Sequence, residues 1–250
     1  MENCQPRCAP IKCKRIACCR VSSQAKRIYN DMRIISRRCL IKLGLLGGLA
    51  SGLGCGSRFG KALALPTPAE TEGPFYPVND QADKDADLTH IDGRGDSALG
   101  QYILISGRVM DVAEHPLAEV MLAIWQADAN GRYHHPLDSN PVPADANFQG
   151  WAIISSDNDG FFYFKTVMPG AYPATQTWIR PPHIHFKIAK QGYATLITQM
   201  YFPDQELNTT DLLLSRKSST ERSAMIAKNA GQQGNWVIYE YNVILDLLHQ

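Results

Sequence analysis

The sequence predicts an all-β fold: a β-sandwich preceded by an extended N-terminal arm, with one short helix near residues 219–230. From Tyr102 onward, short apolar runs recur with turn residues between them. Strands of about 5 to 8 residues separated by such turns are typical of a sandwich. Pro, Gly and Asp dominate residues 65–100, which indicates an arm with little regular structure. The composition, 44% hydrophobic and 20% charged, is ordinary for a globular chain.

Seven segments share an apolar pattern bounded by turn residues, and each is predicted to be a strand. In chain order they are YILISGRVMD (102–111), MLAIWQAD (121–128), GWAIISS (150–156), FFYFKTV (161–167), HIHFKIA (183–189), LITQMYF (196–202) and NWVIYEYNVIL (235–245). The tetrapeptide DNDG joins the third run to the fourth with the chemistry of a tight turn. Only SSTERSAMIAKN (218–229) has the character of a helix.

Charge and cysteine content divide the chain at Ala64. The first 64 residues hold 13 Lys and Arg against two acids, a balance of +11, and the remainder holds 12 basic and 22 acidic residues, a balance of −10. Binding to phosphates needs clustered Lys and Arg, so the acidic part argues against a nucleic-acid partner. All seven cysteines lie in the first 64 residues, so a metal in the remainder must be held by nitrogen and oxygen.

The first 64 residues resemble a twin-arginine export signal. Arg37 and Arg38 precede a Gly-rich apolar run at 43–53, and Ala62-Leu63-Ala64 has the small-x-small pattern of a cleavage site. We expect cleavage after Ala64 and an exported protein, periplasmic or extracellular. Twin-arginine export carries proteins already folded, which suits one that acquires its cofactor in the cytoplasm.

Other readings of this segment stay open. A membrane anchor needs about 20 apolar residues, and this run is shorter and rich in Gly, so we expect no stable membrane span. A lipid anchor on Cys55, in SGLGC, is the weaker alternative. The residues before Met32 add nothing that a signal needs, so we expect translation to start at Met32. The expected organisation is a signal at 1–64, an arm at 65–100 and a β-sandwich domain at 101–250.

The stretch WIRPPHIHFKI (178–188) carries the most informative residues. His183 and His185 are two apart on a predicted strand, so their side chains lie on the same face. Tyr133 closes the loop ADANGRYHHP, and Tyr172 lies in the turn MPGAYP, and such strand-end loops are where a sandwich presents functional side chains. Each residue alone also fits a structural role, and the histidines alone would also suit a zinc or copper site.

Taken together, these motifs resemble the intradiol ring-cleavage dioxygenases, a family that includes protocatechuate 3,4-dioxygenases and catechol 1,2-dioxygenases. The chain resembles the catalytic subunit of the former, and a catechol 1,2-dioxygenase-like enzyme is the alternative within the family. The similarity runs from TEGPFYP (71–77) through GRV, PLAEVMLAIWQADANGRY, DNDGFFYFKTVMPGAYP and WIRPPHIHFKI to LITQMYFPD (196–204). The resemblance implies a transthyretin-like sandwich with an immunoglobulin-like arrangement. It also implies an enzyme of aromatic compound catabolism that acts on a catechol-type molecule with O2.

The same resemblance implies one non-haem ferric ion, Fe(III), held by Tyr133, Tyr172, His183 and His185 with a hydroxide or water. Tyr172 and His185 would be axial. A phenol has a pKa near 10, but a trivalent cation strongly favours its anion. Hard oxygen ligands in turn stabilise ferric iron, in contrast to ferrous sites with two histidines and one carboxylate.

The implied reaction inserts oxygen between the two hydroxylated carbons and yields a cis,cis-muconate-type diacid. Tyr172 would release the metal and take a substrate proton, so it is expected to act as ligand and base. Arg180 is expected to stabilise negative charge on the substrate. Gln199 is expected to hydrogen-bond near Arg180 or the substrate, and Tyr76 to line the substrate pocket.

The resemblance also bears on the oligomeric state and on a rival function. Relatives with a separate non-catalytic subunit lead us to expect a homo-oligomer or pairing with a related subunit. The rival function is a metal-free, transthyretin-like binding module of a secreted protein. Such modules lack the residues equivalent to Tyr172 and the His183/His185 pair, so these residues discriminate between the two functions.

Overall fold

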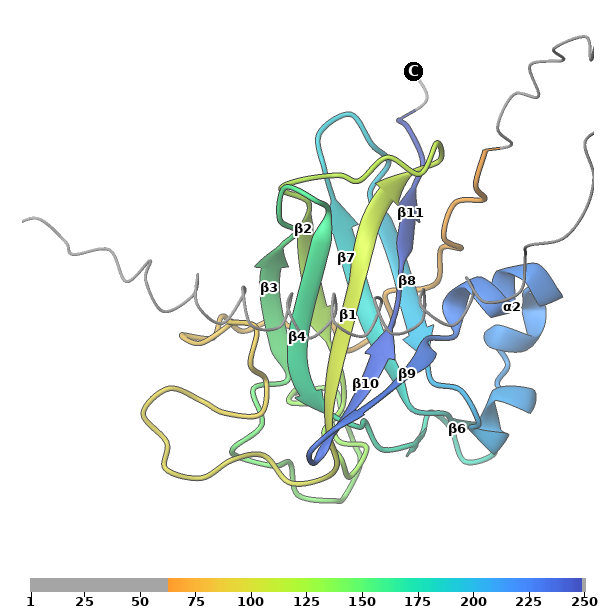
Figure 1. The fold of residues 1–250 in the computed structure, drawn as a ribbon. Helices are drawn as coiled ribbons and strands as arrows, with labels where there is room; N and C mark the ends of the chain where they lie inside the picture. The colour runs from red at the N-terminus through yellow and green to blue at the C-terminus, as the bar shows by residue number, and fades with distance from the viewer. Residues whose placement is uncertain (1–62, 249–250) are drawn as a thin grey trace, which may run out of the picture. The chain divides into compact units, whose positions relative to one another are not determined.

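The computed structural model describes residues 63–248, and it confirms the all-β sandwich (Figure 1). One sheet has five strands: β1 (Tyr102–Asp111), β4 (Phe161–Val167), β9 (Lys228–Gln233), β10 (Trp236–Glu240) and β11 (Val243–Leu245). The other has four: β2 (Met121–Trp125), β3 (Trp151–Ser155), β7 (His183–Ala189) and β8 (Leu196–Tyr201). A two-stranded ribbon, β5 (Tyr172–Pro173) with β6 (Ile179–Arg180), lies outside both sheets. The twin arginine, Cys55 and Met32 fall outside the described residues.

The five-stranded sheet is organised around β1, the longest strand. β4 pairs with β1 antiparallel, whereas β10 and then β11 pair with it parallel. The segment 235–245, predicted as one strand, is therefore two strands that meet β1 in succession. Gly107 permits this arrangement, because a Cβ at this position would lie 1.8 Å from the carbonyl oxygen of Tyr241.

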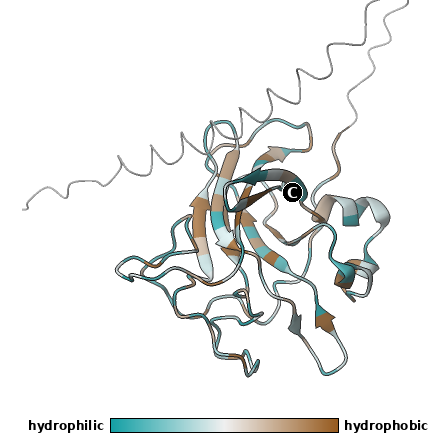
Figure 2. Ribbon diagram, turned by 60° about the horizontal axis from the view of Figure 1, so that its bottom comes forward, coloured by the Kyte–Doolittle hydropathy of each residue, from teal (hydrophilic) through white to brown (hydrophobic). Residues whose placement is uncertain are grey.

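The four-stranded sheet has two faces with different roles. β2 pairs antiparallel with β3 and with β7, and β7 pairs antiparallel with β8. Apolar and hydrophilic positions alternate along the strands (Figure 2), and the apolar set packs against the five-stranded sheet. The core between the sheets includes Leu122, Ile124, Ile184, Phe186, Met200 and, from the other sheet, Ile105, Phe162 and Phe164. Burying each such side chain contributes about 1.5–3 kcal/mol.

The opposite face of this sheet carries the histidines. The register places Trp125 beside His185 and His185 beside Gln199, and it places His183 beside Tyr201. All five side chains are buried although they point away from the core between the sheets. This outer face is covered, so β7 is buried on both sides from His183 to Phe186 although its outer face carries two polar imidazoles.

The N-terminal arm supplies part of that cover. Within the described residues the arm from 63 to 100 has no strand or helix beyond isolated bridges, as predicted. The amide of Glu70 donates to the carbonyl of Ile197 (2.8 Å), and the hydroxyl of Thr198 donates to the carbonyl of Pro68 (2.7 Å). Lys187 pairs with Glu72 at 3.1 Å. The arm is therefore fastened across β7 and β8.

The predicted helix is present but shorter than expected. α2 spans Ser219–Met225 and begins with a capping box between Ser218 and Glu221. It does not continue to residue 230, because Ile226 is extended and Lys228–Gln233 forms the edge strand β9. That strand was not predicted, since its mostly exposed sequence KNAGQQ lacks an apolar alternation. Two 3-10 turns, η1 (Glu206–Thr209) and η2 (Leu214–Arg216), precede α2.

None of the helices within residues 63–248 combines the length and the apolar character that crossing a bilayer requires.

Candidate metal centre and active site

The two histidines of β7 form the floor of the candidate site. Their ring centroids lie 4.9 Å apart on the outer face of the sheet, as the spacing of two residues predicts. The ring of Trp125, from the neighbouring strand β2, stacks on His185 at 4.8 Å with an interplanar angle of 13°. Strand pairing and this stacking hold the imidazole of His185 in one orientation.

Tyr133 reaches the histidines from the long loop between β2 and β3. Two buried carboxylates organise this loop: Asp128 accepts from the amides of Asn130 (2.8 Å) and Arg132 (3.0 Å), and Asp138 accepts from the amide of Tyr133 (2.7 Å). The hydroxyl oxygen of Tyr133 lies 3.5 Å from Nε2 of His183. Neither carboxylate was identified from the sequence, and together they position the tyrosine.

Tyr172 enters from the ribbon strand β5, and its ring meets that of Tyr133 edge-on at 5.4 Å. The two tyrosine-bearing loops touch through glycines. A Cβ on Gly170 would lie 2.4 Å from the amide nitrogen of Gly131, and one on Gly131 would lie 2.4 Å from the carbonyl oxygen of Ala171. Gly131 also has a φ of +77°, which L side chains rarely adopt. These glycines set the separation of the two phenols.

We expect Gly131→Ala to destabilise the fold by about 1–3 kcal/mol and to lower the iron bound per chain, because backbone strain and a clash with Ala171 would separate the two tyrosines. Denaturant unfolding and iron analysis measure both effects. Gly192→Ala is the matched control: Gly192 also has a positive φ, of 86°, but a Cβ there would meet nothing within 4 Å. Equal iron content in the two variants would contradict the spacing role of Gly131.

The histidines are electrically neutral and suited to bind a metal. Nδ1 of His183 lies 2.7 Å from the carbonyl oxygen of Pro181, so Nδ1 carries the proton and Nε2 is unprotonated, with its lone pair directed into the site. Burial, with Arg180 and His185 nearby, holds the pKa of His183 well below its usual value. Burial and the charge of Arg180 lower the pKa of His185 to about 3. Nδ1 of His185 is buried without a hydrogen-bond partner.

The pKa values of the two phenols shift in the opposite direction. Burial raises the pKa of Tyr133 well above 10, and the neighbouring Tyr172 adds to the shift. Burial also raises the pKa of Tyr172, although Arg180 opposes it. Both phenols are therefore protonated at neutral pH unless a strong positive charge joins them. Two neutral imidazoles and two buried phenols are a donor set that a hard, trivalent cation fits. In residues 63–248 no group of three or more His, Cys, Asp or Glu could hold a metal.

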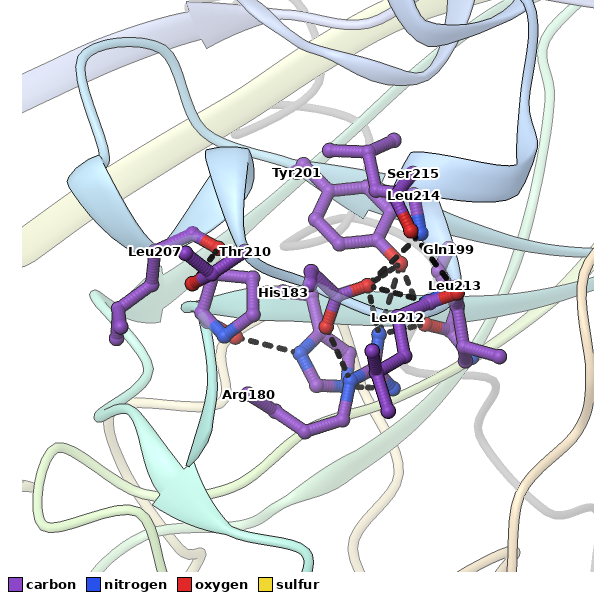
Figure 3. A network of polar contacts seen from close by, with 12 residues as sticks. Arg180, His183, Gln199, Tyr201, Leu207, Thr210, Leu212, Leu213, Leu214 and Ser215 are labelled. Atoms are coloured by element: carbon purple, nitrogen blue, oxygen red, sulfur yellow. Dashed lines mark hydrogen bonds and ion pairs between the residues drawn. The ribbon is translucent and has the colours of Figure 1, made fainter. Parts of the chain in front are cut away.

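Arg180, at the end of β6, lies at the centre of a buried polar network (Figure 3). Its Nε donates to Asp211 (2.9 Å), and its Nη2 donates to Gln199 (2.9 Å) and to the hydroxyl of Tyr201 (2.8 Å). Its Nη1 lies 3.4 Å from Nε2 of His183. The structure thus places Gln199 on Arg180, and the amide of Gln199 donates in turn to the arm at Thr71.

Asp211 and Tyr201 were not identified from the sequence. Asp211 is fully buried, pairs with Arg180, and also accepts from the amides of Leu213 (3.1 Å) and Leu214 (2.9 Å) at the start of η2. An Asp before an apolar run is a recognisable cap signal. However, that signal does not reveal that the carboxylate faces an arginine 31 residues earlier in the chain.

A cavity of about 750 Å³ opens beside these groups, and Tyr172, Arg180 and His185 lie on its wall. Phe75 also lines it and stacks on Tyr133 at 4.6 Å. Tyr76, expected to line the pocket, is not on this wall. Its ring packs edge-on against Trp125 at 4.9 Å, beneath Lys187. Phe75 and Tyr76 lie in a turn of the arm and their rings point to different sides, so Phe75 rather than Tyr76 faces the cavity.

The chain is similar to known ring-cleaving dioxygenases. A family model described as Dioxygenase matches residues 71–247. The protocatechuate 3,4-dioxygenase beta chain of Burkholderia cepacia is 34% identical over 179 residues, which cover 69% of this chain and 76% of the relative. The catechol 1,2-dioxygenase 2 of Acinetobacter lwoffii is 31% identical over 183 residues, covering 63% of this chain and 62% of the relative.

A solved structure extends the likeness to three dimensions. The dioxygenase domain of a carbohydrate-binding fusion protein from Streptomyces sp. SirexAA-E is 29% identical, with a TM-score of 0.55, and the match covers 73% of this chain and 99% of that domain. These matches favour a ring-cleaving enzyme over a metal-free binding module. The family match over most of the sandwich shows that this chain belongs to the intradiol ring-cleavage dioxygenases.

Proposed function

We propose that this enzyme holds one non-haem ferric ion through Tyr133, Tyr172, His183 and His185. With O2 it cleaves a catechol-type ring between its two hydroxylated carbons and yields a cis,cis-muconate-type diacid. The observation that carries the proposal is the convergence of two neutral imidazoles and two phenols: Tyr133 lies 3.5 Å from Nε2 of His183, and the two tyrosine rings lie 5.4 Å apart. These residues come from β5, from β7 and from the loop between β2 and β3, so segments far apart in the sequence bring the four side chains together.

The bound ferric ion would supply the positive charge that ionises the phenols and the catechol hydroxyls, and it would make the ring reactive towards O2. The protein supplies the proton acceptor. Tyr172 lies on the cavity wall, whereas Tyr133 is not among the lining residues and is covered by Phe75. Tyr172 is therefore the phenolate that a substrate hydroxyl can reach, and its Oη accepts the substrate proton.

Arg180 supplies the charge stabilisation. Its guanidinium lies on the same wall, next to His183, and is held by Asp211, Gln199 and Tyr201. A cation fixed in advance at the place where negative charge develops needs no reorganisation during the reaction. We assign to Arg180 the stabilisation of anionic substrate oxygen, and to Gln199 the positioning of Arg180.

The experiment is to load the full chain with ferrous salt in air, record the visible spectrum, and then add catechol while following O2 uptake and product absorbance. We expect about one iron per chain, a visible ferric tyrosinate band and one O2 consumed per ring. Removing the iron with a reductant and a chelator should abolish both the band and turnover. A chain that binds no iron, or that binds zinc or copper in preference to iron and shows no ferric tyrosinate band, would contradict the proposal.

We also propose that the chain assembles with itself or with a related subunit. Support comes from its likeness to both the beta chain and the alpha chain of the Burkholderia cepacia protocatechuate 3,4-dioxygenase, at 34% and 28% identity. Light scattering during size-exclusion chromatography tests this directly, and a monomer at micromolar concentration would count against self-assembly.

Export is a further proposal, and it rests on Arg37, Arg38 and the Ala62–Ala64 pattern. Cell fractionation and N-terminal sequencing of the mature protein test it, with Leu65 expected as the first residue. Replacing both arginines by lysine should retain the precursor inside the cell, and recovery of the enzyme only in the cytoplasm would refute export.

A further inference from the structure

We infer that the cavity selects catechols with an uncharged, largely apolar ring substituent and disfavours catechols that carry a carboxylate. This inference rests on the proposed function, since it takes the two catechol oxygens to lie at the Tyr172, Arg180 and His185 end of the cavity. A substituent on the far side of the ring then meets the remaining wall.

The charges on that wall leave nothing to pair with a carboxylate. Of the residues that line the cavity, only Arg180 and Asp138 carry a charge at neutral pH. Arg180 is 3% exposed, is paired with Asp211 at 2.9 Å, and lies at the end of the cavity assigned to the catechol oxygens, so it is not placed to pair with a carboxylate on the far side of the ring. Asp138 is itself negative. A substrate carboxylate would therefore lose water without gaining a cation, which is unfavourable in a partly enclosed site.

The rest of the wall suits apolar groups. Apart from Tyr172 and His185, eight of its side chains are hydrocarbon or aromatic: Pro74, Phe75, Leu137, Pro141, Pro173, Ala174, Trp178 and Leu213. The other five side chains are polar but uncharged: Thr71, Ser139, Asn140, Thr175 and Gln176. The volume of about 750 Å³ lies within the range of about 300–1,000 Å³ that holds drug-sized ligands, well beyond what a single dihydroxybenzene ring fills. Each methylene buried against such a wall strengthens binding about fourfold.

The charge of the whole folded part acts in the same direction. Residues 65–250 carry 22 acidic and 12 basic side chains, a balance of −10. A protein field of this sign lowers the local concentration of anionic ligands relative to neutral ones and slows their association. Once residues 1–64, with their balance of +11, are removed by cleavage, selection against a carboxylate is thus expected during association as well as in the cavity.

The test compares protocatechuate with 3,4-dihydroxybenzamide, which differ in charge but hardly in shape. Binding to the iron-loaded full chain is measured by calorimetry without O2, and kcat/KM is then measured by O2 uptake. We expect the amide to bind at least tenfold more tightly and to react with a higher kcat/KM. An amide withdraws more electron density from the ring than a carboxylate, so ring electronics would favour the acid. A preference for the amide therefore reports charge.

A second measurement tests the apolar wall. 4-Butylcatechol has three more methylenes than 4-methylcatechol, and we expect at least tenfold tighter binding of the butyl compound. Leu213→Ser should reduce that ratio. Equal binding of the two alkylcatechols would contradict the assignment of an apolar substituent.

A third test adds a positive charge to the cavity wall. Gln176 lines the cavity and is exposed, so Gln176→Lys is expected to fold and to raise the ratio of acid to amide binding at least tenfold. Gln176→Met matches its length without the charge and should leave the ratio unchanged. Val78→Lys adds the same charge at an exposed position away from the cavity, and should change neither the ratio nor turnover of catechol.

The outcomes separate the two proposals. Tight binding of the amide without O2 uptake would refute the proposed oxygenase function and leave the selectivity intact. Protocatechuate binding as tightly as the amide, binding of neither, or a Gln176→Lys ratio equal to that of wild type would each overturn the selectivity.

Discussion

Replacing Arg180 by glutamine is expected to lower kcat by about 10²- to 10³-fold while iron stays bound, because the change removes a preorganised charge and no metal ligand. It is also expected to reduce the free energy of unfolding by about 3–5 kcal/mol, since Asp211 is fully buried and loses its countercharge. Steady-state O2 uptake, the visible spectrum and denaturant unfolding measure the three quantities on one preparation.

A double variant separates the catalytic effect from the structural one. Arg180→Gln with Asp211→Asn removes both buried charges, so it should recover most of the lost stability, whereas kcat should stay low because the guanidinium is still missing. Asp211→Asn alone keeps the cation and leaves it less firmly held, so it should lower kcat less than the loss of Arg180. Recovery of kcat in the double variant would show that Arg180 acts only by keeping the fold.

Replacing Tyr172 by phenylalanine should weaken and shift the visible ferric tyrosinate band and lower kcat by about 10²- to 10⁴-fold, the contribution usual for a positioned proton acceptor. The same change removes one anionic ligand, so the iron content is recorded with the spectrum, and kcat is expressed per bound iron. The pH dependence of kcat should also change, since the group that accepts the substrate proton is lost.

Tyr201→Phe is the control for Tyr172→Phe. Tyr201 is another buried tyrosine that contacts Arg180, at 2.8 Å, but it is not among the cavity-lining residues. Its loss should leave the visible band in place. An unchanged band and unchanged kcat in Tyr172→Phe, or the loss of the band in Tyr201→Phe, would contradict the ligand assignment.

The strands of the sandwich could be predicted because their signal is local. An apolar run between turn residues identifies a strand without knowledge of its partner, and six of the seven predicted runs each became a single strand. The last run, 235–245, became two, because β1 accepts β10 and β11 as successive partners and Gly107 allows the close approach. β9 was not predicted, because an exposed edge strand needs no apolar side chains.

For the site, spacing and motif resemblance were sufficient for the residues that a strand or a turn presents directly. His183 and His185 share a face in any β-strand, and Tyr133 and Tyr172 follow recognisable turn sequences. Pocket lining was harder, since the choice between Phe75 and Tyr76 depends on which way the arm turns its side chains as it crosses β7 and β8. That direction is set by the contacts of Glu70 and Thr198 with the arm and the sheet.

By itself, then, the sequence determined the class of fold, the shared face of the two histidines and the family of the enzyme, because periodicity and contiguous motifs are properties of neighbouring residues. The tertiary structure alone decided that Asp211 balances Arg180, that Gly131 and Gly170 set the spacing of the two tyrosines, and that the cavity wall has no spare cation. These facts depend on which distant segments meet when the sheets pack and the arm covers them. Residues far apart in the sequence give no local signal that they will be in contact.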